Sequence, residues 1–191
     1  MNTQTLSFGR KKLEIEGDLV SHNNGYFYRE VTNPDAIMFY YDPIELDMYR
    51  IGTKACLHLR DAQNNILKLT FRSYFGFRKQ KMYQVFQEVL DTLWELFFEA
   101  KMESCRTEIQ AGKSVDFGRF RLNQIGISQL NQSGLVEKEL RFDDCKIVPK
   151  YGKTLLYSLR DPNEHVEIDV RWDWNAYFIE KIVGELCPSS T

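Results

Sequence analysis

Two stretches of the chain open with nearly the same residues: "FGRKKLEIEG" at positions 8–17 and "FGRFRLNQIG" at positions 117–126. Each starts with Phe-Gly-Arg and continues with apolar side chains at alternate positions. Such alternation predicts a β-strand with one buried face. The repeated opening predicts that the chain contains two copies of one β-rich unit.

Two further matches follow in the same order. Leu59-Arg60-Asp61 recurs as Leu159-Arg160-Asp161, and polar turn residues follow both tripeptides. The segment "LKLTFR", ending at Arg72, has the same apolar alternation as "VEIDVR", ending at Arg171. One tripeptide recurs easily by chance, but three matches in one order and in similar contexts indicate an internal repeat.

Each copy is predicted to end in an amphipathic helix. From Arg78 to about Ser104 there is no proline or glycine, and apolar residues recur at helical spacing. The segment around Gly112 looks like a linker, and Pro188 ends the second helix. We therefore expect one domain over residues 1–106, with a helix at about 78–104, and a second over 107–191, with a helix at about 175–186.

The second copy shows the order of elements most plainly, in "RFRLNQIGIS", "KELRFDDCKIV", "KTLLYSLRD", "HVEIDVRW" and "AYFIEKIVGEL". This order of antiparallel strands and one closing helix resembles the pleckstrin-homology-like (PH-like) superfold, especially its bacterial versions. The resemblance implies an α+β fold that is mainly β, with two small bent sheets or barrels, each closed by a C-terminal helix. The first copy departs from it in "AIMFYYDPIELDMYR", where Pro43 predicts a bend or an edge strand.

Composition and charge limit the classes of partner. The formal net charge of −2 gives no overall field that attracts nucleic acid, which is not an expected partner. The four cysteines are far apart, give no zinc signature and are expected to be reduced. The first residues lack the apolar core of a secretion signal, and no run reaches the roughly 20 apolar residues of a membrane span. We expect no transmembrane segment and a cytoplasmic location.

Catalytic signatures are missing from the sequence. No nucleophile elbow, HExxH motif or glycine-rich phosphate loop occurs. Asp143 and Asp144 are expected in a polar turn, and His58 is expected at a surface position on a strand. Trp172 and Trp174 are expected on one face of a strand, in a core or an interface. We therefore predict no enzyme, no catalytic or metal-binding residue and no cofactor.

The long predicted helix has more apolar surface than one small sheet covers. Trp94, Phe97 and Phe98 are the residues that we expect in its contact face. Two interpretations stay open: the face joins the two copies, or it binds a protein partner or a second copy of the chain. Both favour a non-enzymatic interaction or scaffold protein.

The alternative function is a peripheral membrane or phosphoinositide-binding module. Arg72, Arg78, Lys79 and Lys81 follow one another at the junction of a predicted strand and the long helix, in "RSYFGFRKQK". Cations mixed with aromatic residues suit an anionic lipid headgroup. The same pattern also has an interpretation without a ligand, in which the cations are simply exposed to water and the aromatic residues cap the core. The second copy has Asp173 and Glu180 near the corresponding place.

Overall fold

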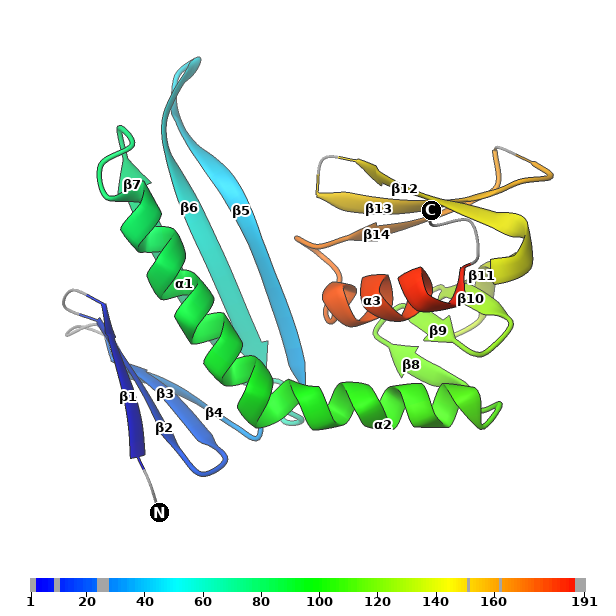
Figure 1. Ribbon diagram of the computed structural model, residues 1–191, viewed down its shortest axis with the longest axis horizontal. Helices are drawn as coiled ribbons and strands as arrows, with labels where there is room; N and C mark the ends of the chain where they lie inside the picture. The colour runs from blue at the N-terminus through cyan, green and yellow to red at the C-terminus, as the bar shows by residue number, and fades with distance from the viewer. Residues whose placement is uncertain (1–2, 9–10, 24–27, 151, 162, 188–191) are drawn as a thin grey trace. The chain divides into compact units, whose positions relative to one another are not determined.

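The computed structural model of the protein describes residues 3–8, 11–23, 28–150, 152–161 and 163–187 (Figure 1). The chain divides into two compact units, Met1–Glu99 (unit 1) and Ala100–Thr191 (unit 2). This division falls inside a continuous helical stretch, and the boundary expected after residue 106 lies further along the same stretch. We describe each unit by itself.

Unit 1 contains two antiparallel sheets followed by a helix. Its strands are β1 (Thr3–Phe8), β2 (Lys11–Glu16), β3 (Leu19–Asn23), β4 (Tyr28–Thr32), β5 (Ala36–Leu46), β6 (Tyr49–Arg60) and β7 (Ile66–Tyr74). The first four strands form one sheet in the order β1-β2-β3-β4, and the last three form another in the order β5-β6-β7. Helix α1 (Lys79–Leu93) and a π-helical segment (Trp94–Phe98) follow.

The core of unit 1 lies between α1 and the three-stranded sheet, and α1 contacts β6 and β7. Leu57, Leu67 and Leu69 point from the sheet into this core and are fully buried. Phe86 of α1 is also fully buried, and its ring lies edge-on to that of Phe71, with the centroids 5.5 Å apart. The predicted amphipathic stripe is thus the surface by which α1 packs on the sheet.

Strands β5 and β6 form a long hairpin. Pro43 lies in β5, which is an edge strand of its sheet, and the register shifts between Ile44 and Glu45. The prediction of a bend or an edge at Pro43 is therefore confirmed, since a residue without an N–H is tolerated there. The segment "AIMFYYDPIELDMYR", in which the first copy departs from the resemblance, forms most of this hairpin, with its turn at Asp47 and Met48.

Unit 2 starts with a helix and then repeats the arrangement of two sheets and a helix. Its elements are α2 (Glu99–Gln110), β8 (Val115–Phe117), β9 (Phe120–Leu122), β10 (Gly126–Leu130), β11 (Val136–Arg141), β12 (Cys145–Lys150), β13 (Lys153–Ser158), β14 (His165–Asp169) and α3 (Ala176–Leu186). The sheets have the orders β11-β10-β9-β8 and β12-β13-β14. Phe120, Leu156 and Phe178 are fully buried in its core.

The two units share one topology: a four-stranded meander, a three-stranded meander and then a helix. Phe8 and Phe117 both end the first strand of their unit, although Gly9 and Arg10 lie outside the described residues. The repeated Leu-Arg-Asp tripeptides both lie where the second strand of the smaller sheet turns into the third. Asp61 accepts a hydrogen bond from the amide of Gln63 at 3.0 Å, and Asp161 accepts one from Asn163 at 2.9 Å. Both aspartates therefore accept a hydrogen bond within a similar turn, but Leu59 is buried in β6, whereas Leu159 is exposed and follows the end of β13.

Two local predictions were wrong. The helix does not stop near Ser104 but runs to Gln110, because no helix breaker precedes Gly112, whose φ of 78° suits a C-terminal cap. Trp172 and Trp174 do not share a strand face, because β14 ends at Asp169 and both lie in the loop before α3. The mainly-β α+β class is as expected. No helix in the described ranges combines the length and the hydropathy of a membrane span.

Candidate interaction surface

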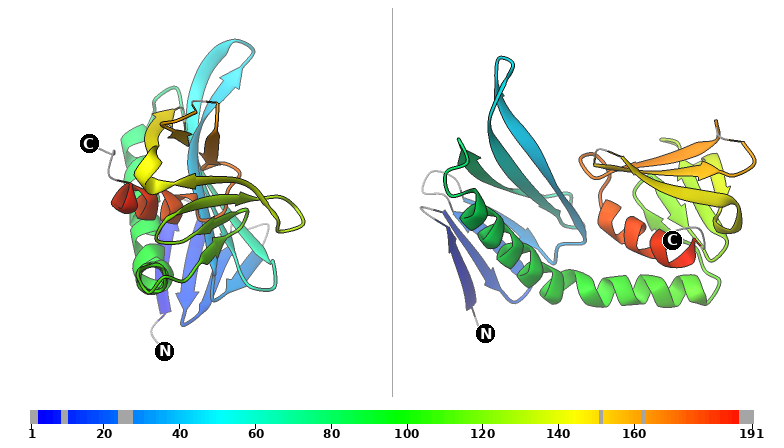
Figure 2. Two further views of the ribbon diagram at one scale, coloured as in Figure 1. Left: turned by 90° about the vertical axis from the view of Figure 1, so that its right-hand side faces the viewer. Right: turned by 45° about the horizontal axis from the view of Figure 1, so that its top comes forward.

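The β5–β6 turn and the β7–α1 loop lie at one end of unit 1 (Figures 1 and 2), and both carry exposed apolar side chains. We call these six residues the tip surface: Leu46, Met48, Tyr49, Tyr74, Phe75 and Phe77. Met48 is 95% exposed, Phe77 80% and Phe75 79%. Large apolar side chains exposed together in this way mark contact sites.

The sheet register brings the turn and the loop to the same end. Gly52, near the start of β6, is paired with Tyr74, the last residue of β7. The amide of Phe75 donates to the carbonyl of Ile51 at 2.6 Å, so the loop leaves the sheet beside the hairpin. A Cβ at Gly52 would lie 2.4 Å from the carbonyl oxygen of Ser73, and glycine therefore permits this close approach.

The backbone of the β7–α1 loop holds its aromatic rings outward. Phe75 and Arg78 have positive φ angles of 51° and 55°, a left-handed conformation that costs a non-glycine residue about 1–2 kcal/mol. The hydroxyl of Ser73 donates to the carbonyl of Phe77 at 2.7 Å, and the amide of Phe77 donates to the carbonyl of Tyr74 at 2.9 Å. The loop is therefore closed by its own hydrogen bonds while Phe75 and Phe77 contribute little to the core.

The four predicted cations are all exposed, but the structure does not bring them to one point. Arg78, Lys79 and Lys81 lie together at the start of α1. Phe71 faces α1, so the next residue, Arg72, points to the other face of the sheet. None of the four forms an ion pair with a residue that the structure describes.

The start of α1 is unusual in its charge. Its first turn holds no acidic residue, and the N-cap residue, Arg78, makes no capping hydrogen bond through its side chain. From residue 62 to residue 87 the chain has five cationic and no acidic side chains. Cations at a helix N-terminus are disfavoured by the helix dipole, so this arrangement does not stabilise the helix. It leaves several positive charges exposed at this end of the helix.

The predicted contact face on the long helix is only partly exposed. Phe98 is fully buried, while Trp94 and Phe97 are half-buried. The ring of Phe98 lies 6.2 Å from that of Trp94 and 6.5 Å from that of Phe97, measured between centroids. Leu96, which the sequence did not single out, is 51% exposed and offers the larger apolar surface in this segment.

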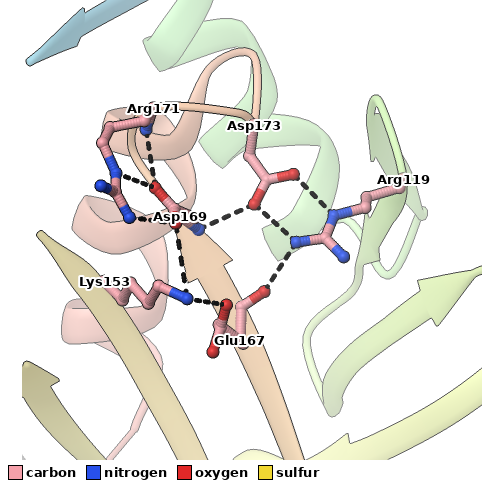
Figure 3. Close-up of polar contacts among 6 residues, drawn as sticks. All are labelled: Arg119, Lys153, Glu167, Asp169, Arg171 and Asp173. Atoms are coloured by element: carbon pink, nitrogen blue, oxygen red, sulfur yellow. Dashed lines mark hydrogen bonds and ion pairs between the residues drawn. The ribbon is translucent and has the colours of Figure 1, made fainter.

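The β14–α3 junction of unit 2 holds a different arrangement, a network of paired charges (Figure 3). Arg119 donates two hydrogen bonds to the carboxylate of Asp173, at 2.6 and 2.8 Å, and a third to the carbonyl of Glu167. Asp173 also accepts the amide of Asp169 at 2.7 Å. Arg119 belongs to the second Phe-Gly-Arg tripeptide, so this residue ties the first hairpin of unit 2 to the loop before α3.

Asp169 is the most enclosed carboxylate of the network. Burial by itself would raise its pKa, but hydrogen bonds from the side chain and amide of Arg171 and the charge of Lys153 outweigh burial, so its pKa is lowered. Hydrogen bonding to Asp173 likewise raises the pKa of Arg119. The three cations and three carboxylates of Figure 3 therefore pair with one another. This network acts as internal stabilisation and has little charge left for a ligand.

The other polar residues that the sequence singled out, Asp143, Asp144 and His58, contact neighbouring side chains. Asp143 and Asp144 lie in a short 3-10 helix, where they pair with Arg141 and Arg160. His58 is half-buried, more enclosed than expected, and its ring contacts Tyr40. No group of histidine, cysteine and acidic residues suited to a metal ion occurs among the described residues.

The four cysteines are all buried. The Sγ atoms of Cys145 and Cys187 lie 3.4 Å apart in unit 2. Burial, together with the hydrogen bond between its thiol and that of Cys187, raises the pKa of Cys145 to about 12. The thiolate, which is the reactive form, is therefore scarce at neutral pH.

No protein-family model, no curated protein and no solved structure gives a significant match to the chain.

The sequence interpretation found half of the tip surface. It singled out the loop aromatics Tyr74, Phe75 and Phe77 but not Leu46, Met48 and Tyr49 of the hairpin. A signal was present, because "ELDMYR" places large apolar residues around a hairpin turn, where polar residues usually stand. Without knowledge of the turn position, those residues could equally have belonged to a buried strand.

Proposed function

We propose that the protein is a non-enzymatic interaction module built from two PH-like units, and that unit 1 binds its partner through the tip surface. The observation that carries this proposal is the exposure of six large apolar side chains on the β5–β6 hairpin end and the β7–α1 loop of unit 1, where the three most exposed are Met48, Phe75 and Phe77. Tyr28, Tyr41, Ile66 and Leu96 are exposed elsewhere in this unit, each to a smaller fraction than these three. Apolar side chains that stay in water do not stabilise the fold, so contact with a binding partner explains their presence better.

The identical order of elements in the two units supports the PH-like part of the proposal. In both, a helix follows the three-stranded meander and packs on it, as the resemblance implies. Similar folds serve many functions, so the binding role rests on the surface and not on the fold. Trp94, Phe97 and Leu96 offer a second and smaller contact face, with Phe98 buried behind the exposed residues as a support.

Site-specific photo-crosslinking in an extract that retains membranes tests the proposal. A photoreactive phenylalanine analogue at Phe77 should form adducts with a protein or a lipid. The matched control carries the analogue at Trp172 of unit 2, which is similarly exposed, at 75%. Adducts from position 77 alone support the tip surface as the binding site. Equal labelling from both positions, or none from position 77, contradicts it.

A further inference from the structure

We infer that the tip surface binds the surface of an anionic lipid bilayer, an inference that rests on the proposed function because it names the partner of the same site. The surface combines apolar groups that reach beyond the sheet with cations that surround their base. Each property is expected of a peripheral membrane contact, and together they separate this partner from a purely apolar one.

The apolar groups have the right reach. The four residue steps from Met48 to Gly52 span about 13 Å of extended chain, so the hairpin turn projects past the level at which the β7–α1 loop leaves the sheet. Peripheral segments insert their apolar side chains about 5–10 Å into the boundary between headgroups and acyl chains. Met48 and Leu46 suit the apolar side of that boundary, and Tyr49 and Tyr74 suit its polar side.

The local charge favours an anionic surface. Arg78, Lys79 and Lys81 lie beside Phe77 with no carboxylate in the same loop or first helical turn. This charge runs against the net charge of −2 of the whole chain. Glu45 and Asp47 at the hairpin turn oppose binding there, while Arg50 offsets one of them. The cations of the loop therefore provide most of the attraction.

The direction of the cations favours a surface over a single headgroup. Arg72 points from one face of the sheet, while Lys79 and Lys81 lie on the helix that covers the other face. A phosphate bound in a pocket needs donors that converge on it. Cations that diverge around an apolar projection instead contact several headgroups of a bilayer at once. Soluble headgroups should for this reason bind poorly.

Sedimentation with vesicles tests the inference. The full chain should sediment with vesicles of phosphatidylcholine and phosphatidylglycerol in equal amounts, and much less with phosphatidylcholine alone. Arg78→Gln/Lys79→Gln/Lys81→Gln should weaken binding about a hundredfold at low salt, since each cation near an anionic surface contributes about a factor of five. Phe75→Asn/Phe77→Ser should weaken it about tenfold or more. Asparagine is chosen because it accepts the positive φ of position 75.

The matched control is Lys113→Gln/Lys146→Gln/Lys150→Gln, which removes three exposed lysines from unit 2. It should bind vesicles as the unaltered protein does, and circular dichroism should show all variants folded, because the altered side chains are exposed. Free glycerophosphoglycerol should not compete. The inference is wrong if the control variant binds vesicles as weakly as the Arg78/Lys79/Lys81 variant does, or if the free headgroup competes for binding.

The two proposals can fail separately. If Phe77 crosslinks to a protein while the chain ignores anionic vesicles, the tip surface is a protein-binding site and the bilayer inference is wrong. If Phe77 crosslinks to nothing and the chain ignores vesicles, both proposals are wrong.

Discussion

The β7–α1 junction of unit 1 and the β14–α3 junction of unit 2 occupy the same place in one topology but differ in chemistry. Both helices begin after a residue in the left-handed conformation, Arg78 with φ 55° and Asn175 with φ 61°. Before α3, the carboxylates of Asp169 and Asp173 are buried and paired. Before α1, the cations are exposed and without ion pairs in the described part of the chain.

The difference teaches that two units of the same topology can use one junction in two ways, with its charges paired internally or exposed. In unit 2, Arg119 connects the β8–β9 turn to β14 and to the loop before α3, and the carboxylate of Asp173 accepts hydrogen bonds from Arg119 and from the amide of Asp169. Unit 1 stabilises the corresponding region by packing, through Phe71, Phe86 and Tyr41, and leaves its charges outside. Its hairpin is also longer: β5 and β6 have 11 and 12 residues, whereas β12 and β13 have 6 each.

The largest expected effect concerns the network of unit 2. Arg119→Met keeps the aliphatic stem but leaves the buried carboxylate of Asp173 without its main partner. We expect a loss of about 2 kcal/mol in the free energy of unfolding, the range for hydrogen bonds to charged groups. Urea unfolding, with hydrogen exchange to assign the effect to unit 2, measures it.

Arg141→Met is the matched control, because Arg141 also holds a carboxylate, Asp143, with two hydrogen bonds, but both side chains are exposed. Exposed pairs contribute at most about 1 kcal/mol and often nothing. Equal losses from the two substitutions would mean that burial of the Arg119 network does not matter.

A smaller effect of opposite sign is expected in unit 1. Lys81→Glu places a carboxylate in the first turn of α1, where the helix dipole favours it, and should stabilise the unit by about 0.5–1 kcal/mol. The same change should weaken sedimentation with anionic vesicles. Thermal unfolding and vesicle sedimentation of one preparation measure both. The expectation is that Lys81 contributes to binding but lowers the stability of unit 1. A fall in stability, or unchanged vesicle binding, would contradict this.

The smallest effect is a dependence on pH in unit 2. Burial raises the pKa of Glu180, and the hydrogen bond from Thr154 only partly opposes this. A carboxyl group with a raised folded pKa destabilises the fold above that pKa, and this cost disappears as the pH falls below the unfolded pKa. Glu180→Gln keeps the acceptor for the Thr154 hydroxyl, so it should raise stability by a fraction of a kcal/mol at neutral pH and by nothing in acid.

Urea unfolding at neutral and acidic pH measures this difference. Glu139→Gln, at an exposed position of β11, is the control and should change little at either pH. A gain for the Glu180 variant that persists in acid would show that the charge of Glu180 is not its cause.

Much of the fold could be predicted from local patterns. Alternation identified the strands around Leu57, Leu67 and Leu69, and helical spacing identified α1 and α3, because the burial of one face leaves a period in the sequence. Both Leu-Arg-Asp tripeptides lie near the turn after the second strand of the smaller sheet, but Leu59 and Arg60 are inside β6, whereas Leu159 and Arg160 follow the end of β13. The end of the long helix was misjudged, because the chain has no proline or glycine between Gly76 and Gly112. The end of β14 was misjudged, because no proline or glycine follows Asp169 before Gly184.

The candidate site was less predictable. Nothing local distinguishes Arg119, which is held by a carboxylate 54 positions away, from Arg78, which forms no ion pair with any described residue. Likewise, Arg72 and Lys79 are close in sequence yet lie on opposite sides of a sheet.

The order of residues alone determined the alternation, the helical stripe and the repeat, since these depend on the spacing of apolar groups along a chain. Only the tertiary structure decided which charges meet and which stay in water, because an ion pair depends on distances that the fold creates between remote segments. It also decided that Met48 lies at the end of a projecting hairpin and not in a core. Exposure is a property of the packed chain and not of the residue.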